Sequence, residues 1–269
     1  MLAPPMRFID AHCHLADPRV ESQLEPMLAR ARAVGVNEFV QAGVDPEDWR
    51  RQRALAARYG GMHLVFGLHP WWVVGASDAE AESALCELAP QLVDAVALGE
   101  TGLDFQPRFS AETWPRQEAL FRAQLSMARA RELPVVLHVV RAHDRALQIL
   151  RDDGLSPRGG LVHAFTASRE IAERYLALGL TLSVGGRLVA RRSTKLERAV
   201  AAVPPQRLVI ESDAPDQPPP RLRGQLNEPA TIVEVAAVVA EITCSTAEAV
   251  LRQSAINLRR LLALDRGAG

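Results

Sequence analysis

The sequence predicts an α/β protein that folds as a single (β/α)8 barrel of the TIM type over residues 1–269. Its length of 269 residues lies close to the roughly 250 residues typical of one such barrel. Short β-branched runs alternate with longer stretches rich in Ala, Leu, Arg and Glu along the whole chain. Eight of these runs are candidate strands, and eight strand–helix units are enough to close a parallel sheet, even if the barrel is distorted.

Each candidate strand is apolar over most of its length, as expected of parallel strands that are covered on both faces. In chain order the candidates are Arg7–Ile9, Asn37–Gln41, His63–Phe66, Ala95–Leu98, Pro134–Leu137, Gly160–Val162, Thr181–Val184 and Arg207–Ile210. Helices are expected between them, for example over Gln117–Arg131 and over Glu170–Leu178, where Ser168 is a suitable N-cap. The proline-rich segment Asp213–Gly224 follows the last strand and is expected to be an active-site loop.

An open, doubly wound sheet is the alternative for the same alternation of strands and helices. It predicts a glycine-rich phosphate-binding turn after the first strand. At that place this chain reads Asp-Ala-His-Cys-His-Leu, which contains no glycine. The barrel is therefore the preferred fold.

Composition and charge narrow the class of protein. Lys plus Arg is 31 and Asp plus Glu is 32, so the net charge of −1 argues against binding nucleic acid by overall charge but permits a local basic rim. The separated cysteines Cys13, Cys86 and Cys244 form no CxxC pair and fit reduced thiols. No signal peptide is visible at the N-terminus, and the apolar stretch 231–242 is interrupted by Glu234 and too short to cross a membrane. We expect a cytoplasmic protein without a membrane anchor or an obligate protein partner.

The first strand ends in two histidines that are candidate metal ligands. Residues two apart on a strand point to the same side, so Asp10, His12 and His14 are expected to project together, with Ala11 and Cys13 facing away. Two adjacent imidazoles can bind a metal ion, but a short motif of this kind fits hydrogen-bonded core histidines about equally well.

Four further polar residues, each at the end of an apolar run, favour the metal site. They are Glu100, His138, His163 and Asp213. The strands of a barrel converge with their carboxyl ends on one face, so all six side chains are expected in one pocket there. Four imidazoles and two carboxylates exceed the four ligands of a structural zinc site and indicate two divalent metal ions. Zn, Mn, Co and Ni suit these ligands, whereas Mg prefers more oxygen atoms.

At these residues the chain resembles the TatD family of metal-dependent deoxyribonucleases. The matching segments, in family order, are FIDAHCHL, GLHPWW, GETGLD, LPVVLH, LVHAFTAS, LSVGG, ESDAP and GQLNEP. The resemblance implies that His12, His14, Glu100 and Asp213 bind one metal ion, and that Glu100 bridges to a second ion bound by His138 and His163. It also implies that His69 lies near the bound phosphate. The chain departs from the family pattern at Val140, where the family usually has Arg.

The function expected first is hydrolysis of phosphodiester bonds in single-stranded or damaged DNA by a metal-activated water. Asp213 would orient or deprotonate that water, and Glu100 would bridge the metals. An alternative keeps the two metals but cleaves a carboxyl ester, lactone or amide, including an aminoacyl-tRNA ester. A third, of another class, is a metal-free barrel that acts as a binding scaffold.

Substrate contacts are expected from basic and aromatic residues on loops after the strands. The candidate substrate-binding residues are His69, Arg141, Arg187 and Arg191, with Arg192, Lys195, Arg221 and Arg223 as further cations. Trp71 and Trp72 are candidates for stacking on an unpaired base, although such a pair more often packs against its neighbours. His63 and His143 match no ligand position and are expected to be structural or exposed. Cys13 is expected to be a packing residue.

Overall fold

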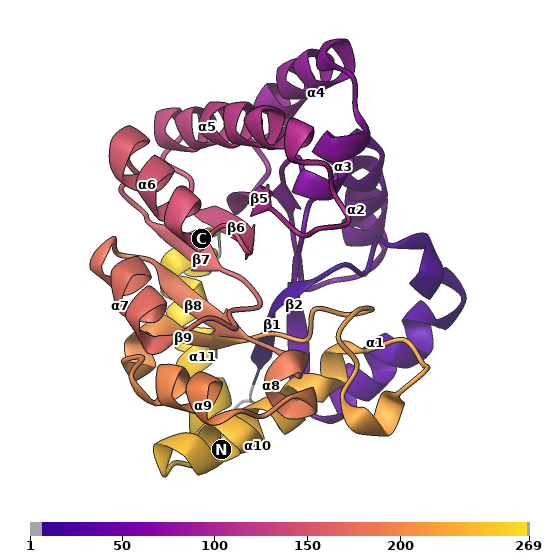
Figure 1. Ribbon diagram of the computed structural model, residues 1–269. Helices are drawn as coiled ribbons and strands as arrows, with labels where there is room; N and C mark the ends of the chain where they lie inside the picture. The colour runs from indigo at the N-terminus through magenta and orange to yellow at the C-terminus, as the bar shows by residue number, and fades with distance from the viewer. Residues whose placement is uncertain (1–6, 268–269) are drawn as a thin grey trace.

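The computed structural model describes residues 7–267 as a barrel of parallel strands surrounded by helices (Figure 1). The strands are β1 (Phe8–Cys13), β2 (Val36–Gln41), β3 (Met62–His63), β4 (Val65–Phe66), β5 (Ala97–Asp104), β6 (Val135–Val140), β7 (Gly160–Val162), β8 (Thr181–Val184) and β9 (Leu208–Ile210). Every paired strand runs parallel to its neighbour. The predicted (β/α)8 barrel is confirmed. Residues 1–6, which belong to the N-terminal segment without a visible signal peptide, lie outside the described part.

The barrel is assembled from two hydrogen-bonded sheets. One has the strand order β1-β2-β3 and the other β4-β5-β6-β7-β8-β9. The predicted strand His63–Phe66 is split at Leu64 into β3 and β4, so a single bent strand position joins the two sheets. On the other side, β1 and the residues after β9 are connected by two backbone hydrogen bonds, from Asp213 N to the His12 oxygen and from His14 N to the Ala214 oxygen. The barrel is thus closed but distorted, with eight strand positions.

Helices follow the strands and form the outer layer (Figure 1). The α-helices are α1 (Leu24–Ala33), α2 (Pro46–Arg58), α3 (Pro70–Gly75), α4 (Asp78–Gln91), α5 (Trp114–Ala130), α6 (His143–Asp153), α7 (Arg169–Ala177), α8 (Gly186–Ala190), α9 (Thr194–Ala201), α10 (Ile232–Thr243) and α11 (Ala247–Leu262). The 3-10 helices are Pro18–Gln23, Ala111–Thr113, Pro205–Arg207, Pro220–Leu222, Pro229–Thr231 and Leu264–Gly267.

Local sequence explains where several helices begin. Ser168 accepts a hydrogen bond from the backbone N–H of Ile171 and caps α7, as the sequence predicts. Asp45 caps α2 in the same way, with Pro46 in the first turn, where a missing N–H costs nothing. The helix predicted over Gln117–Arg131 begins three residues earlier, at Trp114, because Pro115 also fits a first turn.

Two apolar layers position the strands. The larger layer lies between the sheet and the helices, and the smaller one fills the barrel. The smaller layer combines Ile9 and Ala11 of β1 with one apolar residue from most other strands, and Leu258 and Leu262 of α11 pack against it. In Figure 1, α11 (yellow) lies behind the strands, so this helix closes one end of the barrel. The opposite end holds the polar residues.

The first and fifth strands are longer than the sequence predicts. β1 continues to Cys13 and β5 to Asp104, whereas the predicted strands end at Ile9 and Leu98. The predicted strands end where the apolar run ends, at Asp10 or at Gly99 and Glu100, but backbone pairing continues beyond these residues. Gly102, for example, still pairs with His138 of β6. His12 and Glu100 therefore lie within strands rather than after them.

The late apolar stretch 231–242 forms most of α10, a core helix whose Ile232, Val235 and Val239 are buried. Within residues 7–267 no single helix is both long and apolar enough to cross a membrane. The helical segments Pro229–Thr243 and Ala247–Leu262 reach the required length and apolar composition only when taken together, and the chain bends by 105° between them.

Candidate metal centre

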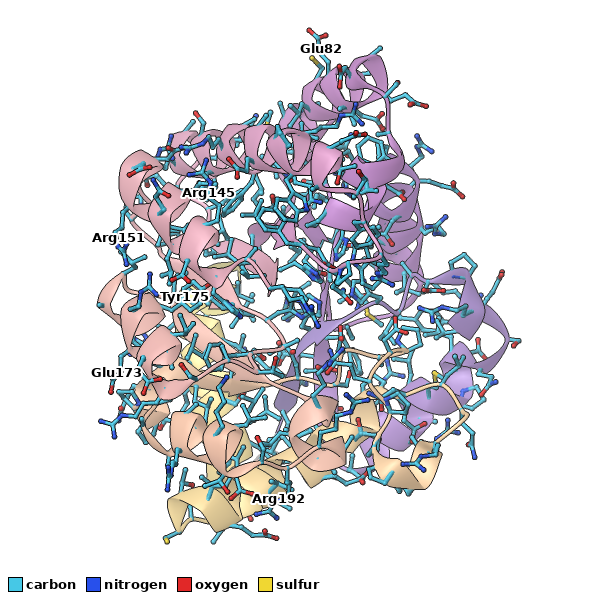
Figure 2. All side chains as sticks on the ribbon, in the orientation of Figure 1. Glu82, Arg145, Arg151, Glu173, Tyr175 and Arg192 are labelled. Atoms are coloured by element: carbon cyan, nitrogen blue, oxygen red, sulfur yellow. The ribbon has the colours of Figure 1, made fainter. Side chains whose placement is uncertain are left out.

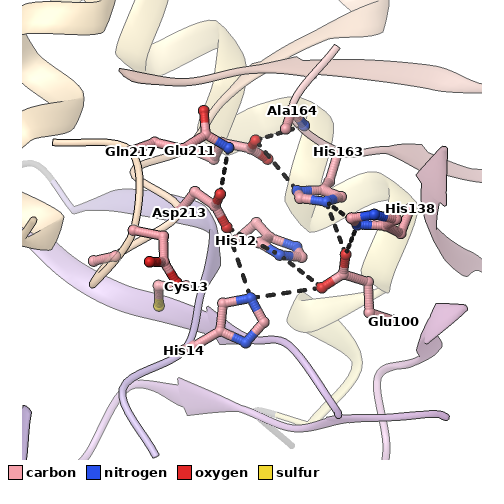
Figure 3. A network of polar contacts seen from close by, with 12 residues as sticks. His12, Cys13, His14, Glu100, His138, His163, Ala164, Glu211, Asp213 and Gln217 are labelled. Atoms are coloured by element: carbon pink, nitrogen blue, oxygen red, sulfur yellow. Dashed lines mark hydrogen bonds and ion pairs between the residues drawn. The ribbon is translucent and has the colours of Figure 1, made fainter. Parts of the chain in front are cut away.

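Six polar side chains meet at the open end of the barrel (Figure 3). They are the six predicted from the sequence: His12, His14, Glu100, His138, His163 and Asp213. His12, Glu100 and His138 lie within β1, β5 and β6. His14 and His163 directly follow β1 and β7, and Asp213 lies in the segment after β9. Apart from His14, all are more than nine-tenths buried.

The carboxylate of Glu100 stands between two groups of imidazoles. Its Oε2 lies 3.2 Å from Nε2 of His12 and 3.5 Å from Nε2 of His14. Its Oε1 lies 2.8 Å from Nδ1 of His138 and 2.8 Å from Nε2 of His163. Each oxygen of one carboxylate thus faces its own pair of histidines, and we call these the first half (His12, His14) and the second half (His138, His163).

Asp213 completes the first half. Its Oδ1 lies 3.6 Å from Nε2 of His12 and 3.7 Å from Nε2 of His14. The side-chain amide of Gln217 donates a hydrogen bond to the other oxygen, Oδ2, and so keeps Oδ1 directed at the histidines. Asp213 has a φ of 58°, a left-handed conformation that non-glycine residues adopt rarely and that is common at functional sites.

The chemistry of these groups fits divalent metal ions. His12 Nε2 and Glu100 Oε2 are buried yet have no hydrogen-bond partner among the described residues, which is costly unless something else binds them. Around a tetrahedral cation with bonds of about 2.0–2.2 Å, neighbouring ligand atoms are about 3.4 Å apart. The separations of 3.2–3.7 Å in the first half match that spacing. The centre is therefore built to bind divalent metal.

The outer nitrogens of the second-half histidines face carboxylates. Asp104 Oδ2 lies 3.2 Å from Nε2 of His138, and Glu211 Oε1 lies 3.6 Å from Nδ1 of His163. Asp104 is within hydrogen-bond distance and so keeps the proton on the outer nitrogen of His138, with the lone pair of the other nitrogen turned towards the centre. Glu211 is too far from His163 for a hydrogen bond and acts on that ring only by its charge. His138 thus presents Nδ1 and His163 presents Nε2, the two atoms that face Glu100.

His69 also reaches the centre, from the N-cap position of α3. Its Nε2 lies 3.2 Å from Oε1 of Glu100, at a distance that also permits metal binding together with His138. Its Nδ1 accepts a hydrogen bond from the backbone N–H of Trp71, at 3.0 Å. Burial lowers the pKa of His69 to about 4, so the ring is neutral and its one proton is on Nε2. His69 therefore acts as a hydrogen-bond donor that points into the centre.

The electrostatics differ across the centre. Burial favours the neutral form of Glu100, but its interactions with the imidazoles of His163, His69 and His12 outweigh burial and hold its pKa well below the usual range. Burial lowers the pKa of His12. It also opposes the charged form of His163, yet the charge of Glu100 prevails and raises the pKa of that imidazole well above its usual value. Burial raises the pKa of Asp213.

Asp10 does not join the centre, which corrects the predicted alternation along the first strand. Its carboxylate accepts hydrogen bonds from the backbone N–H and the hydroxyl of Ser212, at 2.9 and 2.5 Å. Ala11 packs inside the barrel, whereas Cys13 belongs to the outer apolar layer, with its thiol 3.6 Å from the Val40 oxygen. The reason is a register shift between Asp10 and Cys13 in the pairing of β1 with β2, which breaks strict alternation.

Three glycines let the backbone come close behind Glu100. A Cβ on Gly43 would lie 2.5 Å from the Gly99 oxygen, and one on Gly67 would lie 2.5 Å from the Gly99 carbonyl carbon. The backbone N–H of Glu100 in turn donates to the Gly43 oxygen at 2.9 Å. Close packing of these segments therefore fixes the position of Glu100 from behind.

The predicted substrate-binding arginines are exposed. Arg141, Arg187 and Arg191 lie on the surface in the segments after β6 and β8. Arg192 forms ion pairs with Glu197 and Glu241 and lies at the lower edge of the molecule near α10 (Figure 2). Arg221 likewise pairs with Glu234. Arg192 and Arg221 are therefore less available to a substrate than the sequence alone indicates.

The remaining aromatic and histidine candidates differ in exposure and in their contacts. Trp72 packs against the outer apolar layer, whereas Trp71 keeps 46% of its surface exposed. His63 contacts Glu38 at 2.8 Å, and His143 contacts the Tyr175 hydroxyl at 3.0 Å, so both histidines have structural partners away from the centre.

Three residues of the centre were missed as functional candidates: Asp104, Glu211 and Gln217. Glu211 follows the apolar run 208–210, so the rule that found Glu100 could also have found Glu211. Asp104 is preceded by Thr101, Gly102 and Leu103, so that rule could not have found it. The role of both carboxylates as partners of histidines depends on side-chain directions that no spacing reveals. Gln217 lies in a proline-rich loop whose path only the structure shows.

Comparison with known proteins agrees with the geometry. A family model described as TatD related DNase matches residues 9–263. The metal-dependent hydrolase YjjV of Escherichia coli (strain K12) is 36% identical over 239 residues, which cover 88% of this chain and 90% of the relative. The 3'-5' ssDNA/RNA exonuclease TatD of Klebsiella pneumoniae (strain 342) is 36% identical over 264 residues, which cover 95% of this chain and 98% of the relative.

Solved structures show the same architecture. The crystal structure of YjjV from Escherichia coli K12 superposes with a TM-score of 0.86 at 34% identity, covering 96% of this chain and 98% of that one. A hydrolase of the TatD family from Entamoeba histolytica superposes with a TM-score of 0.82 at 20% identity, covering 96% of this chain and 99% of that one. The second likeness supports the fold alone.

Proposed function

The chain belongs to the TatD family and is a metal-dependent hydrolase, and from this premise we propose that it is a two-metal nuclease that cleaves phosphodiester bonds in single-stranded or damaged DNA. The observation that carries the proposal is the division of Glu100, whose two oxygens face two separate pairs of imidazoles. A carboxylate can bridge two cations in this way, whereas an imidazole cannot. The relative named an ssDNA/RNA exonuclease supports nucleic acid as the substrate.

The proposed ligands follow the two halves of the centre. His12, His14 and Asp213 would bind one ion, His138 and His163 the other, and Glu100 both, as the contacts of the two Glu100 oxygens and of Asp213 suggest. Bound there, divalent cations of Zn, Mn, Mg, Co or Ni supply Lewis acidity to a phosphate and lower the pKa of a water molecule towards neutrality.

The chain's own residues supply proton transfer and orientation. We assign Asp213 as the group that accepts the proton of the attacking water, because its Oδ1 faces the centre while Gln217 binds its Oδ2. His69 would donate its Nε2–H to a phosphate oxygen, since its Nδ1 is already occupied by the backbone of Trp71. Low exposure of both side chains keeps bulk water away from these contacts.

The rest of the DNA strand must be bound by the rim, because the net charge of −1 offers no general attraction. Arg141, Arg187 and Arg191 are proposed to contact its phosphates. They are exposed, and no ion pair with a carboxylate is found for them among residues 7–267. A cytoplasmic location is part of the proposal and is supported by Cys13, Cys86 and Cys244, which are all free thiols.

The test begins with the metal-stripped protein reloaded with Mg, Mn or Zn. We expect two ions per chain, and cleavage of a single-stranded oligonucleotide that stops with a chelator and is absent in Glu100→Ala. Glu82→Ala, a change of an exposed carboxylate at the far upper edge (Figure 2), is the control. Hydrolysis of carboxyl esters or lactones without any cleavage of oligonucleotides would replace the nuclease by the alternative hydrolase. A folded protein that binds no divalent metal would overturn both.

A further inference from the structure

An exposed tryptophan stands beside the metal centre and is fixed to it. The indole N–H of Trp71 donates a hydrogen bond to Asp104 Oδ2 at 2.6 Å, and the same oxygen lies 3.2 Å from Nε2 of His138. The ring of Trp71 meets that of His69 edge to face, with 4.9 Å between centroids, and its centroid is 5.9 Å from that of His138. Two residues of the centre thus set the orientation of the indole, although 46% of Trp71 remains exposed.

The loop after β5 is tied to the same carboxylate. The backbone N–H and the side-chain amide of Gln106 donate to Asp104 at 3.0 and 2.8 Å. Two residues further on, the guanidinium of Arg108 lies over the Trp71 ring at 4.4 Å and 4.6 Å from the centre of the Phe109 ring. Asp104 therefore positions an imidazole of the centre, an indole and a cationic loop together.

Arg108 is exposed, and its guanidinium lies against the rings of Trp71 and Phe109. No carboxylate within residues 7–267 forms an ion pair with it. A guanidinium on an exposed indole is bound weakly, so it can be displaced by another flat group. Nucleobases stack on tryptophan whatever their sequence, and guanidinium groups bind phosphate with two parallel hydrogen bonds.

We propose that Trp71 and Arg108 form a nucleotide platform at the edge of the second half: a base of single-stranded nucleic acid takes the place of Arg108 on the indole, and the freed guanidinium pairs with an adjacent phosphate. The platform selects substrates that carry bases, and so distinguishes a nucleic-acid strand from a small ester. This inference rests on the proposed nuclease function, but it concerns substrate recognition rather than bond cleavage.

The experiment compares two single-stranded oligonucleotides of equal length and charge, one with bases and one with abasic tetrahydrofuran residues. For the metal-loaded wild type, we expect a lower KM for the base-bearing strand. In Trp71→Ala that KM should rise roughly 5- to 150-fold, the range expected for one stacked base, to the value for the abasic strand. Trp71→Phe should keep part of the difference. Arg108→Gln should raise the KM for the base-bearing strand more than for the abasic strand, because only a stacked base frees the guanidinium for a phosphate. Arg151→Gln, a change of an exposed arginine on α6, should alter neither KM (Figure 2).

Binding of the labelled strands, measured by fluorescence anisotropy in the presence of a chelator, separates the two proposals. Binding that depends on Trp71 without any cleavage would retain the platform and overturn the nuclease. Cleavage in which Trp71→Ala leaves the preference for bases intact would overturn the platform and retain the nuclease. An equal fall in kcat on both strands, with the preference for bases intact, would mean that Trp71 acts only by holding Asp104, and this too would overturn the platform. If the wild type neither bound nor cleaved the strands, both proposals would be overturned.

Discussion

The two halves of the metal centre hold their imidazoles by different means. In the first half, His12 and His14 come from one strand, and backbone hydrogen bonds from Asp213 and His14 join this strand to the segment after β9. Nδ1 of His12 has no partner among the described side chains and backbone groups. In the second half, the histidines come from two strands. The outer nitrogen of His138 is hydrogen-bonded to Asp104, whereas that of His163 has the Glu211 carboxylate at 3.6 Å, beyond hydrogen-bond distance.

This difference shows that the backbone alone can position a pair of ligands when both belong to one strand. Ligands from separate strands depend more on side-chain partners to orient their rings. Substitutions of the outer carboxylates should therefore disturb one half and spare the other. Glu100 belongs to both halves, so its loss should disturb them equally.

The largest effect is expected from Glu100→Ala, which removes the group common to both halves. Activity should fall at least about 1,000-fold, because neither ion keeps its shared ligand and the two positive charges are no longer neutralised. Metal content by mass spectrometry should drop below two ions per chain. The free energy of unfolding without metal should stay the same or rise, since a buried charge is removed. Full occupancy with near-wild-type turnover would contradict the bridging role; Glu82→Ala is the matched control.

The next effect should come from Asp213→Asn, which affects the first half only. The amide cannot accept the proton of the attacking water, so kcat should fall about 100- to 10,000-fold, the usual contribution of such a group. Binding of the second ion should be less affected, because Asp213 lies within 3.7 Å of His12 and His14, whereas His163 is farther away, within 4.8 Å. Titration with a competing chelator checks the metal affinity. If the affinity of both sites fell equally, the halves would not be independent.

A smaller effect is expected from Asp104→Asn and Glu211→Gln, which change the second half of the centre only. Each should lower the metal affinity of the second half about 10- to 100-fold, as loss of such an outer partner typically does. The first half should keep its affinity, because among the described residues the ion pairs of Asp104 and Glu211 with histidines involve His138 and His163, not His12 or His14. A chelator titration of both variants measures the two sites separately. An equal loss of metal affinity at both sites would show that the outer carboxylates influence both halves of the centre.

The smallest effect should come from the rim, outside both halves. The double variant Arg187→Gln/Arg191→Gln should raise the KM for an oligonucleotide a few-fold at low salt and leave kcat unchanged. The slope of log affinity against log salt should become shallower by about 0.7 for each phosphate that the variant no longer binds. Arg151→Gln should leave the slope unchanged. A flat salt dependence in the wild type would show that no phosphates are bound at the rim and would favour an uncharged substrate.

The fold and the set of polar groups at the barrel mouth could both be predicted from the amino-acid sequence. Eight apolar runs predicted eight strand positions, and all eight are present because burial on both faces demands apolar side chains whatever the neighbouring strand is. Polar residues that follow several of these runs could be predicted to lie together, since parallel strands end on one face. That is why the six predicted side chains could be named before their distances were known.

Which atoms face one another depends on the folded chain. Strand pairing sets the register shift that directs Asp10 to Ser212. Side-chain packing places the carboxylates of Asp104 and Glu211 behind the histidines, and it buries most of Trp72 while Trp71 stays exposed. Such contacts join residues up to 202 positions apart, as Asp10 and Ser212 are. Local periodicity extends over only a few residues, so it can show that a group lies at the end of a strand but not which partner orients it.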